Sequence, residues 1–207
     1  MIPSAQITLL ILPLFAGVLF CASPAHGDKF PSTLKIENRQ LKLNGEALCE
    51  WGFFKFDLYR IALWLENTCS DSEEILQRDE ARCLELRFVR SLNEEDMQKA
   101  YRESFRVNAT PLEKTQFSRE IQKFIDGVKA APKRSSMRIE SLPGLGITII
   151  QGESKTLIES SKGFQDLVFR MYVGEKPPTK DVRKGLLGQH PPTVIPAEKE
   201  SADAPEK

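Results

Sequence analysis

The side chains that could carry out nucleophilic or acid–base chemistry are few in this chain, and their types limit the reactions that it could perform. Its two histidines, His26 and His190, lie near the two ends, outside the segment that we expect to fold. The expected folded part therefore lacks the histidine of Ser-His-Asp and Cys-His catalysis and of the common histidine metal sites. Proton transfer would fall to tyrosine, lysine, cysteine, aspartate or glutamate, and we expect no metal and no cofactor.

Three cysteines lie in the expected folded part, and they allow two interpretations. Cys69 and Cys83 flank a polar segment (SDSEEILQRDEAR), so a disulfide between them would close a short excursion between two strands if the protein folds in an oxidising compartment. In the alternative, all three thiols are reduced and partly buried. If the Cys69–Cys83 disulfide forms, Cys49 is left as a free thiol. With no histidine nearby in sequence, Cys49 fits a small buried residue better than a nucleophile.

The N-terminal segment favours export. Residues 1–27 contain no Asp, Glu, Lys or Arg, and an apolar run over 7–21 precedes small residues at Ala25 and Gly27. This pattern is typical of a cleavable signal peptide, because the run is short for a membrane span and Pro13 interrupts it. The alternative is an N-terminal membrane anchor.

The rest of the chain suits one domain followed by a tail. Residues 28–188 are enough to bury a sizeable core, whereas 189–207 are rich in Pro, Glu and Lys and predict disorder. The chain's 29 Lys and Arg balance its 29 Asp and Glu, which gives no electrostatic reason to expect nucleic acid. We expect a periplasmic or secreted protein, for which a protein of the cell envelope is one candidate partner.

Hydrophobic periodicity and turn signals predict an antiparallel-rich sheet with helices against one face, an α+β fold. Asn93 is a candidate helix N-cap, Thr110 opens a capping box with Glu113, and Asn44-Gly45 separates two strands. The expected strands are 34–43, 47–51, one within 53–66, 83–90, 136–140, 146–151 and 155–159. The expected helices begin at 94 and 111 and cover 162–173 and 179–187.

The helix that follows Asn93 carries polar groups on its apolar face. Met97, Tyr101, Phe105 and Asn108 recur at helical spacing, so one face of the helix carries all four. Tyr101 and Asn108 could be a core tyrosine and a C-terminal cap, or they could contact a ligand.

The order of these motifs resembles the chalcone isomerase-like family, particularly its exported bacterial members. The resemblance runs from about Leu41 to Gly188 and depends on four segments: LNGEALCEWGFFKFDLYRIALWLE, CLELRFVR with the following helix that ends in SFRVN, PGLGITIIQGESKTLIESSKGFQDLVFRMYVGEKPP, and KGLLG. It implies an open-faced β-sandwich, which is a large antiparallel sheet with a layer of helices on one face. The family includes chalcone isomerases and fatty-acid-binding members that share the fold without the reaction.

The resemblance also implies where a ligand would bind. The strand arginine that holds the phenolate or carboxylate in the family falls on Cys49, the next-strand hydroxyl on Tyr59, and the helix Tyr-x6-Asn pair on Tyr101 and Asn108. The late-helix hydroxyl falls on Met171, which cannot donate. The fixed cation and one donor are therefore lost, while Tyr59 could equally be ordinary strand packing.

Two other cations lie near Tyr59 in the sequence, and neither fits as a replacement. Arg60 is adjacent to Tyr59, so it faces the other side of a strand, and Lys55 lies roughly 13 Å further along it. We therefore predict no catalytic residue and no chalcone isomerase activity, and a site that binds a small apolar or amphipathic, fatty-acid-like ligand. The alternatives are a structural or interaction module of the envelope and an intramolecular lyase (isomerase) with a rearranged site.

Overall fold

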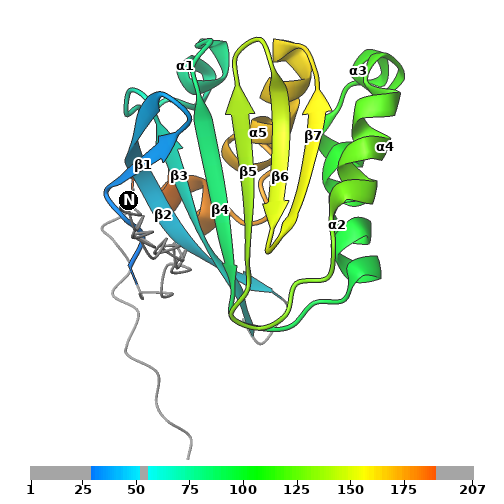
Figure 1. Ribbon diagram of the computed structural model, residues 1–207, viewed down its shortest axis with the longest axis horizontal. Helices are drawn as coiled ribbons and strands as arrows, with labels where there is room; N and C mark the ends of the chain where they lie inside the picture. The colour runs from blue at the N-terminus through cyan, green and yellow to red at the C-terminus, as the bar shows by residue number, and fades with distance from the viewer. Residues whose placement is uncertain (1–28, 52–55, 190–207) are drawn as a thin grey trace, which may run out of the picture.

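Seven antiparallel strands form one sheet whose order in space follows the sequence (Figure 1). A computed structural model describes residues 29–51 and 56–189, so the predicted signal and all but the first residue of the predicted tail lie outside the described residues. Each strand pairs with the next one along the chain, although helices lie in the links after the third and fourth strands. The strands are β1 (Thr33–Ile36), β2 (Arg39–Trp51), β3 (Phe56–Leu65), β4 (Arg82–Phe88), β5 (Ser136–Leu142), β6 (Gly146–Gln151) and β7 (Ser154–Glu159).

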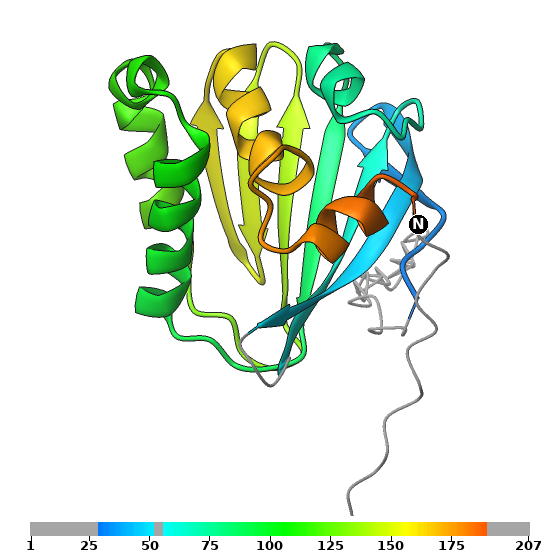
Figure 2. The same cartoon turned by 180° about the vertical axis from the view of Figure 1, so that it is seen from behind.

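The helices gather on one face of this sheet, as Figure 2 shows from behind. They are α1 (Ser72–Gln77), α2 (Glu94–Asn108), α3 (Pro111–Gln116), α4 (Ser118–Gly127), α5 (Lys162–Val173) and α6 (Lys180–Leu186). α6 packs on β2, α5 contacts β6, and α4 packs beside β7 at the edge of the sheet. The predicted α+β open-faced sandwich is therefore confirmed.

Alternation along the strands divides the buried residues between the two faces of the sheet. In β3, Ile61, Leu63 and Leu65 join the large core under the helices, whereas Ala62 and Trp64 join a small cluster on the other face. Phe30 covers that second cluster, with its ring edge-on to Trp64 at 5.5 Å between centroids. The side chains that could form a site with the helices are therefore those of the first face.

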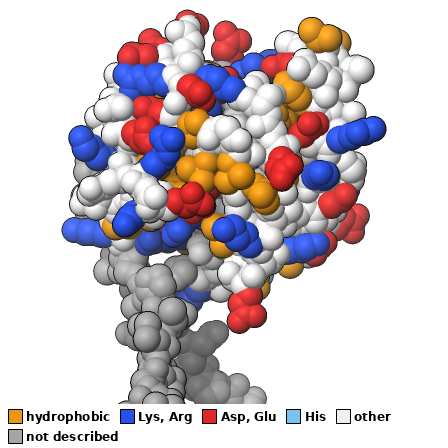
Figure 3. Space-filling view, turned by 45° about the horizontal axis from the view of Figure 1, so that its top comes forward, with side chains coloured by type: hydrophobic (Ala, Val, Ile, Leu, Met, Phe, Trp, Pro, Cys, Tyr) orange, Lys and Arg blue, Asp and Glu red, His pale blue; other side chains and the backbone are white. Residues whose placement is uncertain are grey.

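The face without helices carries charged side chains beside this apolar cluster. Arg138 lies 3.3 Å from a Glu85 carboxylate oxygen and 3.6 Å from one of Glu140. Figure 3 shows cations and anions interspersed over this side of the molecule. This distribution is typical of a solvated face.

Two predicted helix starts are confirmed by their caps. The Asn93 side chain accepts from the Asp96 N–H at the start of α2, and Thr110 and Glu113 form the reciprocal capping box of α3. The second helix differs from the prediction, because it is divided at Phe117, whose ψ of 20° leaves helical geometry. Phe117 places its ring against the core, edge-on to Phe164 at 5.8 Å.

The prediction that Asn44-Gly45 separates two strands is wrong, because both residues lie within β2 at a shift of register. The Asn44 amide donates to the carbonyls of Cys69 and Leu186, at 2.9 and 2.8 Å, and its oxygen accepts from the Cys69 N–H. This side chain therefore ties β2 to α6 and to the segment before α1.

The predicted strand 34–43 is likewise two strands, β1 and the first part of β2. The chain reverses at Glu37, whose φ of 49° is left-handed. The helix α1 was not predicted, and Asp71 caps it by accepting from the Glu73 and Glu74 N–H groups.

The predicted Cys69–Cys83 disulfide is not formed in the structure, where both cysteines are free thiols. Cys83 lies in the cluster on the helix-free face, whereas Cys69 packs against the core under the helices. The Cys69 thiol instead lies 3.3 Å from a Glu74 carboxylate oxygen. The sheet itself separates the two sulfur atoms.

Candidate functional site

All three tyrosines of the chain meet on the helix-covered face of the sheet. Tyr59 comes from β3, Tyr101 from α2 and Tyr172 from α5. Cys49 of β2 and Met137 of β5 complete the group, which we call the tyrosine cluster. Elements from most of the chain's length therefore converge to build it.

Tyr101 and Tyr172 share a buried hydrogen bond. Their hydroxyl oxygens are 2.7 Å apart, and the residues are 7% and 3% exposed. The Tyr101 hydroxyl also lies 4.0 Å from Met137 Sδ, a weak acceptor. Tyr172 can thus donate to Tyr101, which donates in turn to the sulfur.

Cys49 and Tyr59 form the second pair of the cluster. They lie directly opposite one another on β2 and β3, and their side chains are hydrogen-bond partners. The ring of Tyr59 packs edge-on against Phe88, with 5.9 Å between centroids. Cys49 is 1% exposed, while Tyr59 remains half-buried and is the member most open to a ligand.

Burial keeps all four ionisable groups of the cluster protonated at neutral pH. Burial is the first cause that raises the pKa of Cys49, and the hydrogen bond from Tyr59 offsets part of that rise. Burial also raises the pKa of Tyr59 and Tyr101 well above the ordinary tyrosine value, with smaller effects from neighbouring members of the cluster. The pKa of Tyr172 is raised for the same reason.

Within the described residues, no lysine or arginine affects the pKa of any of these four groups. Arg60 faces the opposite side, with its guanidinium over the Phe30 ring at 5.1 Å, as its neighbour position on β3 predicts. Lys55 lies outside the described residues. The described part of the cluster is therefore polar but uncharged.

The structure gives Asn108 a different place from Tyr101. The Asn108 amide donates to the carbonyls of Ser104 and Lys176, at 3.0 and 3.1 Å. These bonds join the end of α2 to the segment after α5. Asn108 therefore holds two elements together, and its amide is not part of the tyrosine cluster.

Met171 is buried in the core, as its position on the apolar side of α5 predicts. The hydroxyl that this helix brings to the site belongs instead to the next residue, Tyr172. Sequence reasoning missed both Tyr172 and Met137. The available signal for Tyr172 was its place on the apolar side of a helix in a chain with only three tyrosines.

No described helix is both long and apolar enough to span a bilayer. The described part of the chain also contains no group of three or more His, Cys, Asp or Glu side chains placed to hold a metal ion.

A comparison with protein families agrees with this fold. A profile of the family described as chalcone isomerase-like matches residues 22–188, and the chain therefore belongs to the chalcone isomerase-like family. This confirms the family resemblance drawn from the motifs.

One solved structure shows how far the fold is shared. A fatty-acid binding protein of Arabidopsis thaliana is similar with a TM-score of 0.58 and 16% sequence identity, over 76% of this chain and 90% of that chain. At this identity the likeness concerns the fold alone. A comparison with curated protein sequences found no significant match.

Proposed function

We propose that this protein is an exported, non-catalytic member of the chalcone isomerase-like family that binds a small apolar or amphipathic ligand at the tyrosine cluster. The observation that carries the proposal is the uncharged state of the cluster. Three phenol groups and one thiol, all protonated, lie among apolar side chains of the helix-covered core. Such a surface suits an apolar chain with a neutral polar group.

The same chemistry argues against catalysis of the family's isomerase reaction. That reaction places negative charge first on a phenolate and then on an enolate, so it needs a fixed cation and preorganised donors. Cys49 stands where the resemblance places the cation, and its raised pKa keeps it neutral. The likeness to a fatty-acid binding protein in fold supports binding in preference to turnover.

Direct binding to the purified protein tests this proposal. A fluorescent neutral lipid analogue should bind in the micromolar range, because the described residues of the cluster offer apolar surface and neutral polar groups. Tyr59→Phe removes the most accessible hydroxyl and should weaken binding of the neutral analogue by about threefold to tenfold. Leu112→Ala, at a side chain 73% exposed on α3, is the control and should leave the affinity unchanged.

A second candidate function is a structural or interaction module of the envelope whose interior is filled by side chains. The near-complete burial of Cys49, Tyr101 and Tyr172 favours it. The same titration separates the two candidates. Absence of binding at micromolar concentrations, with Tyr59→Phe indistinguishable from the parent protein, would support the module and refute the ligand site.

A further inference from the structure

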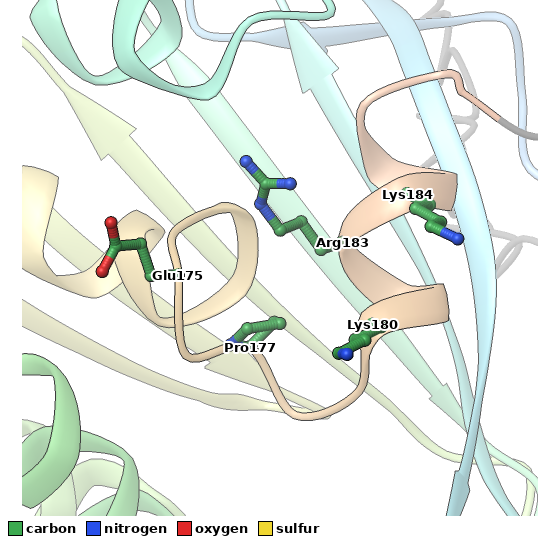
Figure 4. Close-up of a pocket in the computed structure, with 5 residues that line it drawn as sticks. All are labelled: Glu175, Pro177, Lys180, Arg183 and Lys184. Atoms are coloured by element: carbon green, nitrogen blue, oxygen red, sulfur yellow. The ribbon is translucent and has the colours of Figure 1, made fainter.

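A basic pocket lies between α6 and the segment that joins it to α5, outside the tyrosine cluster. It has a volume of about 340 Å³ and is lined by Glu175, Pro177, Lys180, Arg183 and Lys184 (Figure 4). Three cations and one carboxylate therefore surround it, and we call it the α6 pocket. Its volume lies at the lower end of the range for small-molecule sites.

Arg183 is held in place by neutral groups. Its Nε donates to the carbonyl of Val173 at 2.9 Å, and one terminal nitrogen donates to the Ser72 hydroxyl at 3.1 Å. These bonds fix the guanidinium without neutralising its charge. Two of its five N–H donors are thereby used, and three remain for a ligand.

Other half-buried or buried arginines of the described chain pair with carboxylates. Arg82 lies 2.8 Å from Asp166, and Arg170 lies 2.7 Å from Glu113. Arg183 is half-buried, yet no ion pair joins it, Lys180 or Lys184 to any carboxylate among residues 29–51 and 56–189, including Glu175. A partly desolvated guanidinium without a counter-charge stabilises an incoming anion.

The position of the pocket relates it to the tyrosine cluster. The Val173 carbonyl that fixes Arg183 belongs to the residue directly after Tyr172. The pocket therefore borders the end of the helix that supplies one of the cluster's hydroxyls. Lys180 and Lys184 are exposed on the same helix as Arg183, and their flexible side chains can close on an anion.

We propose that the α6 pocket binds a small oxyanion, a phosphate or carboxylate, with Arg183 as the fixed contact and Lys180 and Lys184 as flexible ones. The oxyanion is either a free ion or the headgroup of an amphipathic ligand, and only the second case rests on the proposed function. The cation that the family places on a strand, where this chain has Cys49, would then be supplied from α6 at a different position.

Calorimetry with three probes at constant ionic strength tests the proposal: inorganic phosphate, dodecyl phosphate and dodecanol. Constant ionic strength is needed because salt screens exposed lysines. Dodecyl phosphate should bind about tenfold or more tightly than dodecanol, and Arg183→Gln should remove most of that difference. The double variant Lys180→Gln/Lys184→Gln changes two exposed side chains, so it tests the pocket even if Arg183→Gln perturbs folding.

Arg119→Gln, at an exposed arginine of α4, is the matched control and should leave all three affinities unchanged. If inorganic phosphate binds as tightly as dodecyl phosphate while dodecanol does not bind, the pocket takes a free ion, and the lipid-binding proposal fails alone. If dodecanol binds but the phosphate group adds nothing, or the gain survives both pocket variants, the α6 pocket proposal fails while the lipid-binding proposal stands.

Discussion

At the scale of single residues, the candidate site depends on tyrosine hydroxyl groups that stay protonated because burial raises their pKa. The three tyrosines and Cys49 are paired, Tyr101 with Tyr172 and Tyr59 with Cys49, and no lysine or arginine among the described residues shifts the pKa of any of them. Such paired neutral groups can orient a ligand that carries a carbonyl or hydroxyl. They do not stabilise an oxyanion as a guanidinium would.

The raised pKa values give a first prediction, which an alkaline absorbance titration of tyrosinate can check. An ordinary tyrosine is half-ionised near pH 10, but burial raises the pKa of all three tyrosines in the folded chain. We therefore expect no tyrosinate signal in the native protein at that pH. In guanidinium chloride, where the chain is unfolded, all three should ionise near pH 10.

The same shifts predict the direction of the stability change. Above the unfolded pKa the unfolded chain has lost tyrosine protons that the folded chain keeps, so the free energy of unfolding should fall as pH rises through and beyond about 10. Below that pH these groups should leave the free energy of unfolding unchanged.

The absorbance titration could contradict the first prediction. If one third of the tyrosinate signal of the native protein appears near pH 10, one of the three hydroxyls is solvated.

At the scale of elements, α6 is positioned by close backbone contact with β2. A Cβ added at Gly45 would lie 2.0 Å from the Gly185 carbonyl oxygen, and one added at Gly185 would lie 2.4 Å from the Glu46 carbonyl oxygen. Asn44 adds its hydrogen bond to Leu186 at the same junction. The α6 pocket therefore depends on two glycines from segments far apart in the sequence.

We predict that Gly45→Ala lowers the free energy of unfolding by about 3 kcal/mol, because the backbone of α6 cannot yield without losing its packing. Chemical denaturation of the purified protein measures this. Gly152→Ala is the control: its φ of 56° is left-handed but nothing lies near its Cβ, so the loss should be about 1 kcal/mol. If both variants lose the same free energy of unfolding, the close packing of α6 against Gly45 does not contribute to stability.

Local signals in the sequence predicted most helices and strands. Features that depend on contacts between residues far apart in the chain were not predicted. The caps at Asn93 and Thr110 were found because their partners lie three residues away. The role of Asn44 was missed because its partners, Cys69 and Leu186, are far along the chain. The break at Phe117 likewise reflects its packing on a later helix.

The candidate site was predicted in part for the same reason. Cys49, Tyr59 and Tyr101 lie together as the family resemblance implied, although their ligand-binding role stays a prediction. Tyr172 was missed because a shift of one residue on a helix decides which side chain reaches a site, and the sequence does not fix that rotation. Asn108 shares a helix with Tyr101, but its amide is taken up by backbone carbonyls.

At the scale of the whole molecule, the chain keeps the family's sheet and helix layer, and the cations of the α6 pocket lie outside the tyrosine cluster. The tyrosine cluster holds neutral phenols, while Lys180, Arg183 and Lys184 line the α6 pocket without an ion-pair partner among the described residues. This separation fits a protein that holds an amphipathic molecule without transforming it. Export through the N-terminal segment stays a prediction, because residues 1–28 lie outside the described residues.

The central claim is that, within residues 29–51 and 56–189, no fixed cation is placed to stabilise an oxyanion at the tyrosine cluster. Its most direct test is the rate at which the purified protein converts a 2′-hydroxychalcone to the flavanone, followed by the loss of the chalcone absorbance and compared with buffer alone. The account predicts no acceleration over the spontaneous rate at any protein concentration. A rate that rises in proportion to protein concentration and saturates with substrate would contradict it.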